Sequence, residues 1–287
     1  MEKLRKPHWL NKRLDYQSMK EMGEMLRSLN LHTVCEGAKC PNMGECFRNR
    51  TATFMILGDI CTRNCKFCAI PEGHPAILDP EEPRNLAEAA KKLHLNHVVI
   101  TSVTRDDLSD GGSGQFAACI NELRKELPGS TVEVLIPDFK ANHKSLDIVI
   151  DTKPEIINHN VETVPSLYPI ARPMADYDQS LYVLNYVKLR NKNIFTKSGI
   201  MLGLGEKKEE VIKLFEDLRN VNCDMLTIGQ YLPPSHSHVI LKEYVTPEIF
   251  EEYKQIALEK GFRHVASGPY VRSSYNAIEG INKLNSN

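Results

Sequence analysis

The chain has 287 residues, of which 41% are hydrophobic and 25% are charged, and its formal net charge is -1. This length suffices for a substantial core and favours one large α/β domain, while the near-neutral charge and ordinary composition argue against disorder and against bulk attraction to nucleic acid. No apolar run approaches the roughly 18 residues of a membrane helix and the N-terminus lacks the apolar centre of a signal peptide, so we expect a cytoplasmic protein with no nucleic-acid and no membrane partner.

Residues 1–50 are predicted to form an N-terminal arm ahead of the regular part of the chain. An amphipathic stretch with apolar residues at positions 19, 22, 25, 26 and 29 precedes a cysteine-rich loop. In that loop Cys35, Cys40 and Cys46 are spaced C-x4-C-x5-C in CEGAKCPNMGEC. In a reducing cytosol such cysteines are more often metal ligands or redox groups than disulfides. Alone, the triplet could be coincidence or a zinc site, but beside a second triplet it favours an iron–sulfur cluster whose fourth ligand comes from elsewhere.

That second triplet follows the first predicted strand, residues 53–60. Cys61, Cys65 and Cys68 are spaced C-x3-C-x2-C in CTRNCKFC, where a loop can bring three thiolates toward one point. Iron–sulfur clusters usually have four thiolate ligands, so a [4Fe-4S] cluster held by three leaves one iron open to a ligand with amine and carboxylate groups, such as S-adenosylmethionine. A zinc knuckle is one alternative, but structural zinc prefers four closed ligands. A two-cluster electron-transfer protein is another, and complete sets of four cysteines would be expected for it.

Strand-like and helix-like segments alternate through the rest of the chain. Further strands are expected at residues 97–103, 131–136, 155–160, 198–204 and 224–232. Amphipathic helical periods lie between them, for example at residues 86–93 and 211–218. This alternation indicates a parallel sheet. Six β/α units fit a partial (β/α)6 TIM-type barrel better than a full barrel of eight units, and a doubly wound sheet is the alternative.

Polar clusters follow three of these strands, at residues 104–112, 158–162 and 203–206. The carboxyl ends of parallel strands are where α/β folds bind their ligands. The protein is therefore expected to have one functional face.

Two of these clusters contain candidate residues for an S-adenosylmethionine pocket. Asp110, Gly111 and Gly112 are candidates because glycine lets the backbone approach a ligand closely, although a plain polar turn is almost as good an account. Asn160 and Glu162 alternate along a strand end, so they would point the same way, in reach of ribose hydroxyls or an ammonium group. Solvated polar residues at a strand end are the alternative for this pair.

The remaining cysteines and the histidines are not assigned to a site. Cys119 and Cys223 lie in patterns typical of helix and strand margins, so both are expected to be small buried residues of the core. His236 and His238 are the only close histidine pair, which is too weak a signal for a metal site.

Longer motifs resemble those of lipoyl synthases, a family of the radical S-adenosylmethionine superfamily. They are the two cysteine triplets together with HNVET at 159–163, TKSGIMLGLGE at 196–206, LTIGQYL at 226–232 and VASGPYVRSSY at 265–275. The C-x3-C-x2-C motif alone indicates only the superfamily. The C-x4-C-x5-C spacing combined with a C-terminal RSSY is specific to the family, and the resemblance runs over nearly the whole chain.

The resemblance implies a radical sulfurtransferase with two [4Fe-4S] clusters. The Cys61, Cys65 and Cys68 cluster would cleave S-adenosylmethionine to a 5′-deoxyadenosyl radical that abstracts hydrogen. An auxiliary cluster, held by the arm cysteines and the hydroxyl oxygen of Ser274, would give sulfur to C6 and C8 of a protein-bound octanoyl-lysine chain. A serine ligand is harder than thiolate and should leave iron more easily. The alternative for Ser273 and Ser274 is a helix N-cap before YNAIEGI.

The resemblance also implies the partners and the division of the chain. The substrates would be octanoylated lipoyl-domain proteins, namely the acyltransferase subunit of 2-oxo acid dehydrogenases and the glycine cleavage H protein. A ferredoxin or flavodoxin type electron donor and an iron–sulfur carrier for cluster repair would also be needed. Residues 1–50 would form the arm with the auxiliary cysteines, 51–267 the barrel, and 268–287 a closing segment. A related radical enzyme acting on a free small molecule is the nearest rival, and RSSY argues against it.

One segment departs from the family pattern. After LTIGQYL the chain reads PPSHSHVILKEYVTP, where the family more often has a threonine after the proline and a leucine–proline pair after the later histidine. We expect this variation at residues 233–240 to affect substrate docking and not the proposed cluster ligands.

Overall fold

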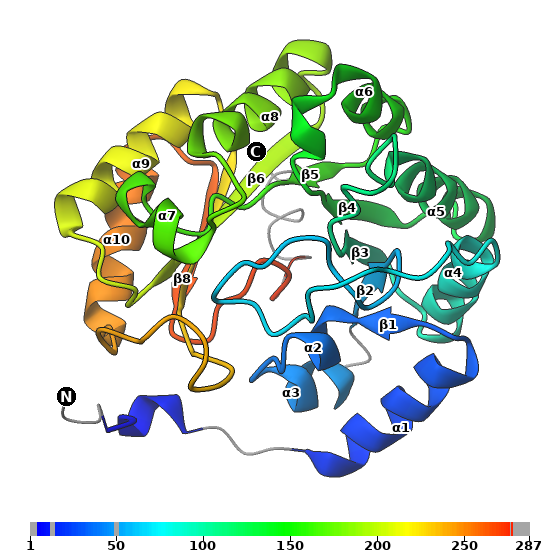
Figure 1. Cartoon of the computed structure of the whole chain (residues 1–287), viewed down its shortest axis with the longest axis horizontal. Coiled ribbons are helices and arrows are strands. Elements are labelled where there is room, and N and C mark those ends of the chain that lie inside the picture. The colour runs from blue at the N-terminus through cyan, green and yellow to red at the C-terminus, as the bar shows by residue number, and fades with distance from the viewer. Residues whose placement is uncertain (1–4, 12–14, 49–51, 276, 278–287) are drawn as a thin grey trace.

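The computed structural model describes residues 5–11, 15–48, 52–275 and 277. Its centre is one sheet of eight strands in the order β1-β2-β3-β4-β5-β6-β7-β8 (Figure 1). From β2 onward each strand pairs in parallel with the next. The strands are β1 His32–Thr33, β2 Thr53–Ile56, β3 His97–Ser102, β4 Thr131–Leu135, β5 Ile156–Asn158, β6 Phe195–Leu202, β7 Met225–Gln230 and β8 His264–Gly268.

Six helices, one from each connection between parallel strands, form the outer layer of the molecule (Figure 1). They are α4 Glu82–Lys92, α5 Ser113–Glu126, α6 His143–Asp151, α8 Tyr177–Arg190, α9 Lys208–Asn220 and α10 Pro247–Glu259. The six predicted β/α units are therefore confirmed. The strictly sequential strand order is that of a barrel and excludes the doubly wound alternative. In the described part of the chain β8 pairs only with β7, so the barrel is open.

The seventh parallel strand, β8, was not among the predicted strands. Its sequence is HVASG, and only Val265 of its five residues is buried. A short strand of small and half-exposed residues has neither the apolar run nor the alternation that identifies strands in a sequence. It forms because β7 offers it a complete row of hydrogen-bonding groups.

The core lies between the sheet and the surrounding helices. Apolar positions of α4, such as Leu86 and Ala90, and of α9, such as Val211 and Phe215, are completely buried, as their helical spacing predicts. Cys119 and Cys223 are completely buried as well, which confirms their expected place in the core. In the described residues, no helix is both long and apolar enough to cross a membrane.

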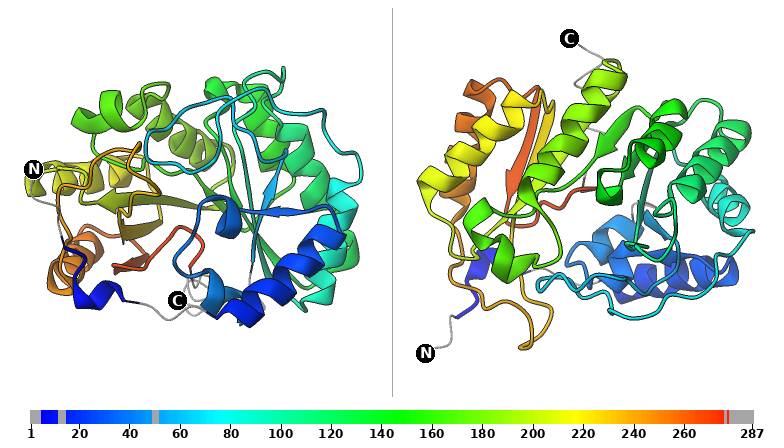
Figure 2. Two further views of the ribbon diagram at one scale, coloured as in Figure 1. Left: turned by 60° about the horizontal axis from the view of Figure 1, so that its bottom comes forward. Right: turned by 45° about the horizontal axis from the view of Figure 1, so that its top comes forward.

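The N-terminal arm lies along β2. It contains α1 Tyr16–Ser28, α2 Val34–Gly37 and α3 Met43–Arg48, and β1 pairs antiparallel with β2. Met22, Leu26 and Phe47 of the arm belong to the same hydrophobic cluster as β2, β3 and α4. Figure 2 shows the arm, in blue, packed against one end of the barrel. Of the predicted closing segment, residues 276 and 278–287 lie outside the described residues.

Candidate cluster sites

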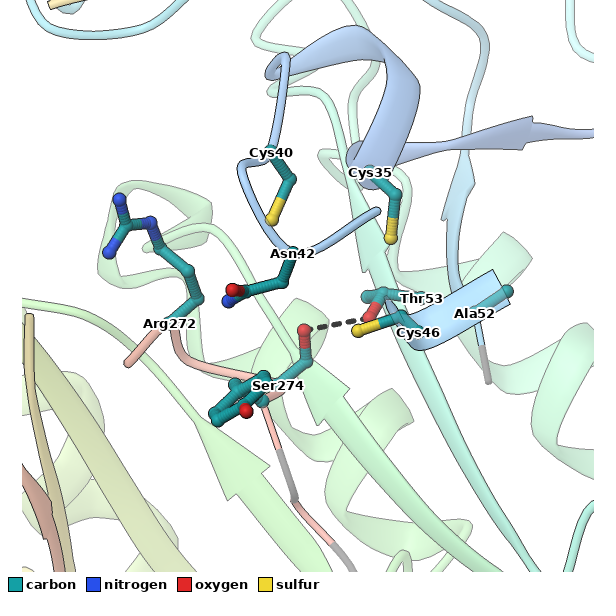
Figure 3. Close-up of a pocket in the computed structure, with 9 residues that line it drawn as sticks. Cys35, Cys40, Asn42, Cys46, Ala52, Thr53, Arg272 and Ser274 are labelled. Carbon is teal, nitrogen blue, oxygen red and sulfur yellow. Dashed lines mark hydrogen bonds between the residues drawn. The ribbon is translucent and has the colours of Figure 1, made fainter. Parts of the chain in front are cut away.

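The three cysteines of the arm face one pocket, which we call the auxiliary pocket. It has a volume of about 290 Å³, including the solvent at its opening, and two regions far apart in the sequence line it, residues 35–53 and residues 272–275. Figure 3 shows the thiol groups of Cys35, Cys40 and Cys46 converging on it, with Ser274 opposite them. The full lining is Cys35, Cys40, Asn42, Cys46, Ala52, Thr53, Arg272, Ser274 and Tyr275.

Local structure in the arm orients the thiols. The side chain of Thr33 caps α2 by accepting a hydrogen bond from the backbone N–H of Glu36, which places Cys35 inside the first turn. The chain then turns back, and the backbone N–H of Cys40 donates to the carbonyl oxygen of Cys35 over 2.9 Å. Cys46 follows on α3. Two short helices and the turn between them thus direct the three thiols to one side.

The segment after β8 closes the auxiliary pocket. Tyr275 donates to Glu45 of α3 over 3.1 Å, and the Asn42 side chain donates to the carbonyl oxygen of Tyr270 over 2.6 Å. Ser274 therefore lies among the arm cysteines, and its hydroxyl accepts a hydrogen bond of 2.7 Å from Thr53 (Figure 3). The N-cap alternative for Ser274 concerns a helix that lies mostly outside the described residues.

The chemistry of the auxiliary pocket suits an anionic iron–sulfur cluster. Burial raises the pKa of the Cys35 thiol to about 12, so its thiolate needs a positive partner such as iron. Arg272 lines the pocket near Cys40, and its guanidinium donates to the backbone carbonyls of Pro269 and Val271, with no carboxylate partner among the described residues. Three thiols, one hydroxyl and one guanidinium fit a cluster that carries negative charge.

The second triplet lies in a loop directly after β2, which we call the cluster loop (residues 61–73). Its three cysteines are half-buried, and the sulfur of Cys61 accepts hydrogen bonds of 3.4 Å from the backbone N–H groups of Arg63 and Thr104. Hydrogen bonds to sulfur tune the reduction potential of iron–sulfur clusters. Burial raises the pKa values of Cys65 and Cys68, the latter to about 12.

Arg63 fastens the cluster loop to the ends of two neighbouring strands. Its guanidinium donates two hydrogen bonds to Asp106, after β3, and two to Asp138, after β4, at 2.6 to 2.9 Å. Burial acts to raise the pKa of Asp138, but the hydrogen bonds and charge of Arg63 outweigh it and hold the pKa well below its usual range. The loop therefore has a charge-paired anchor near its start, between Cys61 and Cys65.

The predicted residues Asp110, Gly111 and Gly112 form the turn that starts α5. The Asp110 carboxylate accepts hydrogen bonds of 2.9 Å from the backbone N–H groups of Gly112 and Gly114. Gly112 has φ +89°, and a Cβ there would lie 2.4 Å from the Leu57 side chain. Local structure thus already accounts for glycine at this position, and a role of this turn in binding S-adenosylmethionine stays a prediction.

The other predicted pair, Asn160 and Glu162, lies near the cluster loop. The Asn160 amide donates to Glu162 over 3.1 Å and to Ser273 over 2.7 Å. Its carbonyl oxygen Oδ1 is buried and has no partner among the described residues. A buried acceptor without a donor fits a ligand that supplies a hydroxyl or ammonium group. Burial raises the pKa of Glu162, and its charge in turn disfavours the thiolates of Cys65 and Cys68.

The variant loop at residues 233–240 contacts the cluster loop, contrary to the expectation that it would leave the cluster ligands alone. The His238 ring Nε2 lies 3.0 Å from the carbonyl oxygen of Cys68, and the backbone N–H of Val239 donates to Lys66 over 2.9 Å. The other side of Lys66 is held by Ala171, whose carbonyl oxygen accepts from the Lys66 N–H over 2.8 Å. The expectation was wrong because a loop distant in sequence returns to this edge of the barrel.

Several residues near the two triplets were missed in the sequence. Arg63 stands between two candidate ligands, Arg272 belongs to the RSSY motif and Thr53 begins the first predicted strand, so their positions offered a signal. Arg172 offered none, although its guanidinium lies close enough to Cys65 to lower the thiol pKa against the effect of burial. In the described residues, no three Cys, His, Asp or Glu side chains are gathered tightly enough to hold a single metal ion, as zinc would need.

Comparison with known proteins places this geometry in a family context. The chain matches the Radical SAM superfamily over residues 55–218. It is 59% identical over 278 residues to the lipoyl synthase of Caldanaerobacter subterraneus subsp. tengcongensis, which covers 97% of this chain and 98% of that protein. It is 54% identical to the lipoyl synthase of Rubrobacter xylanophilus, over 96% of this chain and 86% of that protein. It is 52% identical to that of Caldicellulosiruptor bescii, over 99% and 100%.

Solved structures share the fold at low sequence identity. Methylornithine synthase matches with a TM-score of 0.55 at 15% identity, over 88% of this chain and 85% of that one. Streptococcus suis SuiB, in a crystal structure with S-adenosylmethionine, matches with a TM-score of 0.60 at 12% identity, over 88% of this chain and 60% of that one. Both similarities concern the architecture of the open barrel alone.

Proposed function

The chain belongs to the lipoyl synthase family of the radical S-adenosylmethionine superfamily, and on that premise we propose how its residues divide the reaction. It is a radical sulfurtransferase that acts on octanoylated protein. We propose that it inserts two sulfur atoms, at C6 and C8 of an octanoyl chain borne on a lysine, with the sulfur drawn from an auxiliary [4Fe-4S] cluster.

The observation that supports this proposal is the auxiliary pocket, where three thiols and one hydroxyl, the four candidate ligand groups, lie together. Cys35, Cys40, Cys46 and Ser274 would hold the auxiliary cluster, and Cys61, Cys65 and Cys68 would hold the other. Cys61, Cys65 and Cys68 would hold the cluster that supplies reductive cleavage of S-adenosylmethionine, and the auxiliary ligands would hold the cluster that supplies the sulfur. Ser274 is the harder ligand, which suits a cluster that must be dismantled.

The two proposed cluster sites lie at opposite ends of β2. Thr53, at the start of this strand, lines the auxiliary pocket, and Cys61 follows the strand in the chain. The four residues of β2 span roughly 13 Å at about 3.3 Å per residue. An octanoyl chain held between the two ends could thus meet the radical from one side and the sulfur donor from the other.

The remaining roles follow the side chains available near the cluster loop. Asn160, with its unpartnered carbonyl oxygen, and Glu162 would bind hydroxyl and ammonium groups of S-adenosylmethionine. The turn at residues 110–112 would complete that pocket. Arg63 would fix the position of the cluster loop relative to the ends of β3 and β4 through its hydrogen bonds to Asp106 and Asp138.

The partners and the division of the chain are also part of the proposal. The substrates would be the lipoyl domains of 2-oxo acid dehydrogenase acyltransferase subunits and the glycine cleavage H protein, because both present the modified lysine on a folded domain. A ferredoxin or flavodoxin would supply electrons, and an iron–sulfur carrier would rebuild the auxiliary cluster. The arm at 1–50 and the closing segment at 268–287 would flank a barrel at 51–267.

A single-turnover experiment tests the proposal. Anaerobically reconstituted protein is mixed with dithionite, S-adenosylmethionine and an octanoyl-lysine peptide, and products are read by mass spectrometry. We expect a lipoyl peptide from the unchanged chain. Ser274→Ala should still form 5′-deoxyadenosine but insert little sulfur, whereas Cys65→Ala should form neither product. Cys119→Ala removes a buried thiol outside both triplets and should behave like the unchanged chain.

The outcomes separate the two halves of the proposal. Formation of 5′-deoxyadenosine without sulfur on the peptide, in protein loaded with both clusters, would leave the radical half standing and remove the substrate assignment. Absence of both products would contradict the radical mechanism itself. Full sulfur insertion by Ser274→Ala would remove Ser274 from the ligand set.

A further inference from the structure

The hydroxyl of Thr53 donates to the oxygen of Ser274, and this contact has no part in the ligand set proposed above. We propose that Thr53 is a positioning residue that keeps Ser274 bound to the auxiliary cluster and so sets how slowly the serine-bound iron is lost. The inference rests on the proposed function, because it presupposes that Ser274 is an iron ligand.

The contact is built into the sheet. Thr53 is the first residue of β2, it is 5% exposed, and its Oγ1 lies 2.7 Å from Oγ of Ser274. Its backbone is paired with Val99 of β3 and its branched side chain has few rotamers, so the hydroxyl has little freedom. Figure 3 shows the bond pointing across the auxiliary pocket beside Cys46.

The direction of the hydrogen bond gives it a chemical meaning. For Ser274 to bind iron, its O–H bond breaks, the proton passes to solvent, and an O–Fe bond forms. The resulting alkoxide can only accept hydrogen bonds, and Thr53 can donate one. A bond of this kind to a charged oxygen is stronger than one between neutral hydroxyls. It therefore favours the deprotonated, iron-binding form of Ser274.

Other contacts hold the closing segment independently of Thr53. Ser273 accepts a hydrogen bond of 2.7 Å from Asn160, and Tyr275 donates to Glu45 over 3.1 Å. Removing the Thr53 hydroxyl should therefore leave Ser274 close to the pocket and change mainly its affinity for iron. Partners of metal ligands typically contribute about 10–100-fold to metal affinity.

The test measures iron loss in a protein that holds only the auxiliary cluster. In a background where Cys61, Cys65 and Cys68 are replaced by alanine, the anaerobically reconstituted protein is exposed to a ferrous chelator without S-adenosylmethionine or reductant. Thr53→Val keeps the shape of the side chain and lacks the hydroxyl, and it should release its first iron about tenfold faster. Thr53→Ser retains the donor and should restore slow release.

A neighbouring threonine supplies the matched control. Thr101 of β3 is also 5% exposed, but its hydroxyl donates to the carbonyl oxygen of Leu135. Thr101→Val should therefore release iron at the unchanged rate. If it accelerates release as much as Thr53→Val does, the effect comes from loosening of the sheet, and the inference is overturned.

A further variant separates this inference from the proposed ligand set. Ser274→Ala should release the first iron faster than any Thr53 variant. If Ser274→Ala has no effect, Ser274 is not a ligand and the proposed function loses its fourth donor. If Ser274→Ala accelerates release and Thr53→Val does not, the ligand set stands and the role of Thr53 is wrong.

Discussion

At the scale of single residues, His159 is an unusual buried group beside the proposed S-adenosylmethionine site. It is 2% exposed, and its ring Nδ1 lies 2.9 Å from the carbonyl oxygen of Ile136. Burial, helped by the charge of Arg172, lowers its pKa from 6.5 to about 4. The imidazole is therefore neutral in the folded protein at neutral pH, and it holds the end of β5 against the chain after β4.

This pKa predicts how stability depends on pH. Between pH 6.5 and about 4 the unfolded chain binds a proton at His159 that the folded chain does not bind. Stability from this residue is fully present above pH 6.5 and is lost as the pH falls toward 4, by about 3 kcal/mol in all. His159→Asn keeps a donor for Ile136 and should flatten this part of the curve in urea unfolding.

The exposed His236 provides a control for that measurement. His236→Asn should leave the free energy of unfolding and its pH dependence as they are in the unchanged chain. An equally steep loss of stability between pH 6.5 and 4 in His159→Asn would show that another group is responsible.

At the scale of elements, β7 is shaped to let the closing segment cross it. A Cβ added to Gly229 of β7 would lie 2.2 Å from the carbonyl oxygen of Val271. From that point the segment reaches Asn160 through Ser273 and then Thr53 through Ser274. A glycine inside a strand weakens the sheet. At position 229 it allows the backbone of the closing segment to pass close to β7.

Replacing this glycine should therefore affect the auxiliary site and spare the other cluster. Gly229→Ala should displace Val271 and with it Ser274. The reconstituted protein should therefore hold one cluster per chain in place of two. Gly268→Ala is the matched control, because its nearest contact would be an ordinary 3.6 Å to the Val271 side chain. Iron analysis and the visible spectrum measure both. Equal iron content in the two variants would contradict this account.

At the scale of the whole molecule, the arm and the closing segment meet over the auxiliary pocket but differ in how they are attached. The arm contributes Leu26, Leu31 and Phe47 to the main hydrophobic cluster. The described part of the closing segment is attached mainly by hydrogen bonds, such as those of Tyr275 and of the Tyr270 carbonyl. The arm is thus part of the core, whereas the closing segment lies over it.

Two shortened chains test this difference. A chain of residues 51–287 should lose cooperative thermal unfolding or aggregate, because β2 and α4 lose apolar partners worth several kcal/mol at roughly 25 cal/mol per Å² of buried apolar area. A chain of residues 1–268 should unfold cooperatively. It should bind the cluster of Cys61, Cys65 and Cys68 and lack the auxiliary cluster. If both shortened chains unfold as the complete chain does, the arm is not part of the core.

Local patterns in the sequence determined the cysteine triplets and the six β/α units. Ligands three to six residues apart can be recognised from their spacing, as in the Cys61, Cys65 and Cys68 triplet, and helical or strand periods repeat within a few residues, so both are legible along the chain. Ser274 was assigned through resemblance, because a lone serine has no spacing that announces a ligand.

Only the tertiary structure decided which distant residues meet. Thr53 and Ser274 are 221 positions apart, Arg63 lies 75 positions from Asp138, and His238 lies 170 positions from Cys68. These contacts arise because parallel strands bring their ends to one edge and because the chain returns across the open barrel after β8. Local periodicity does not encode such returns. The spacing of the cysteine triplets is therefore visible in the sequence, whereas the distant groups that contact them are not.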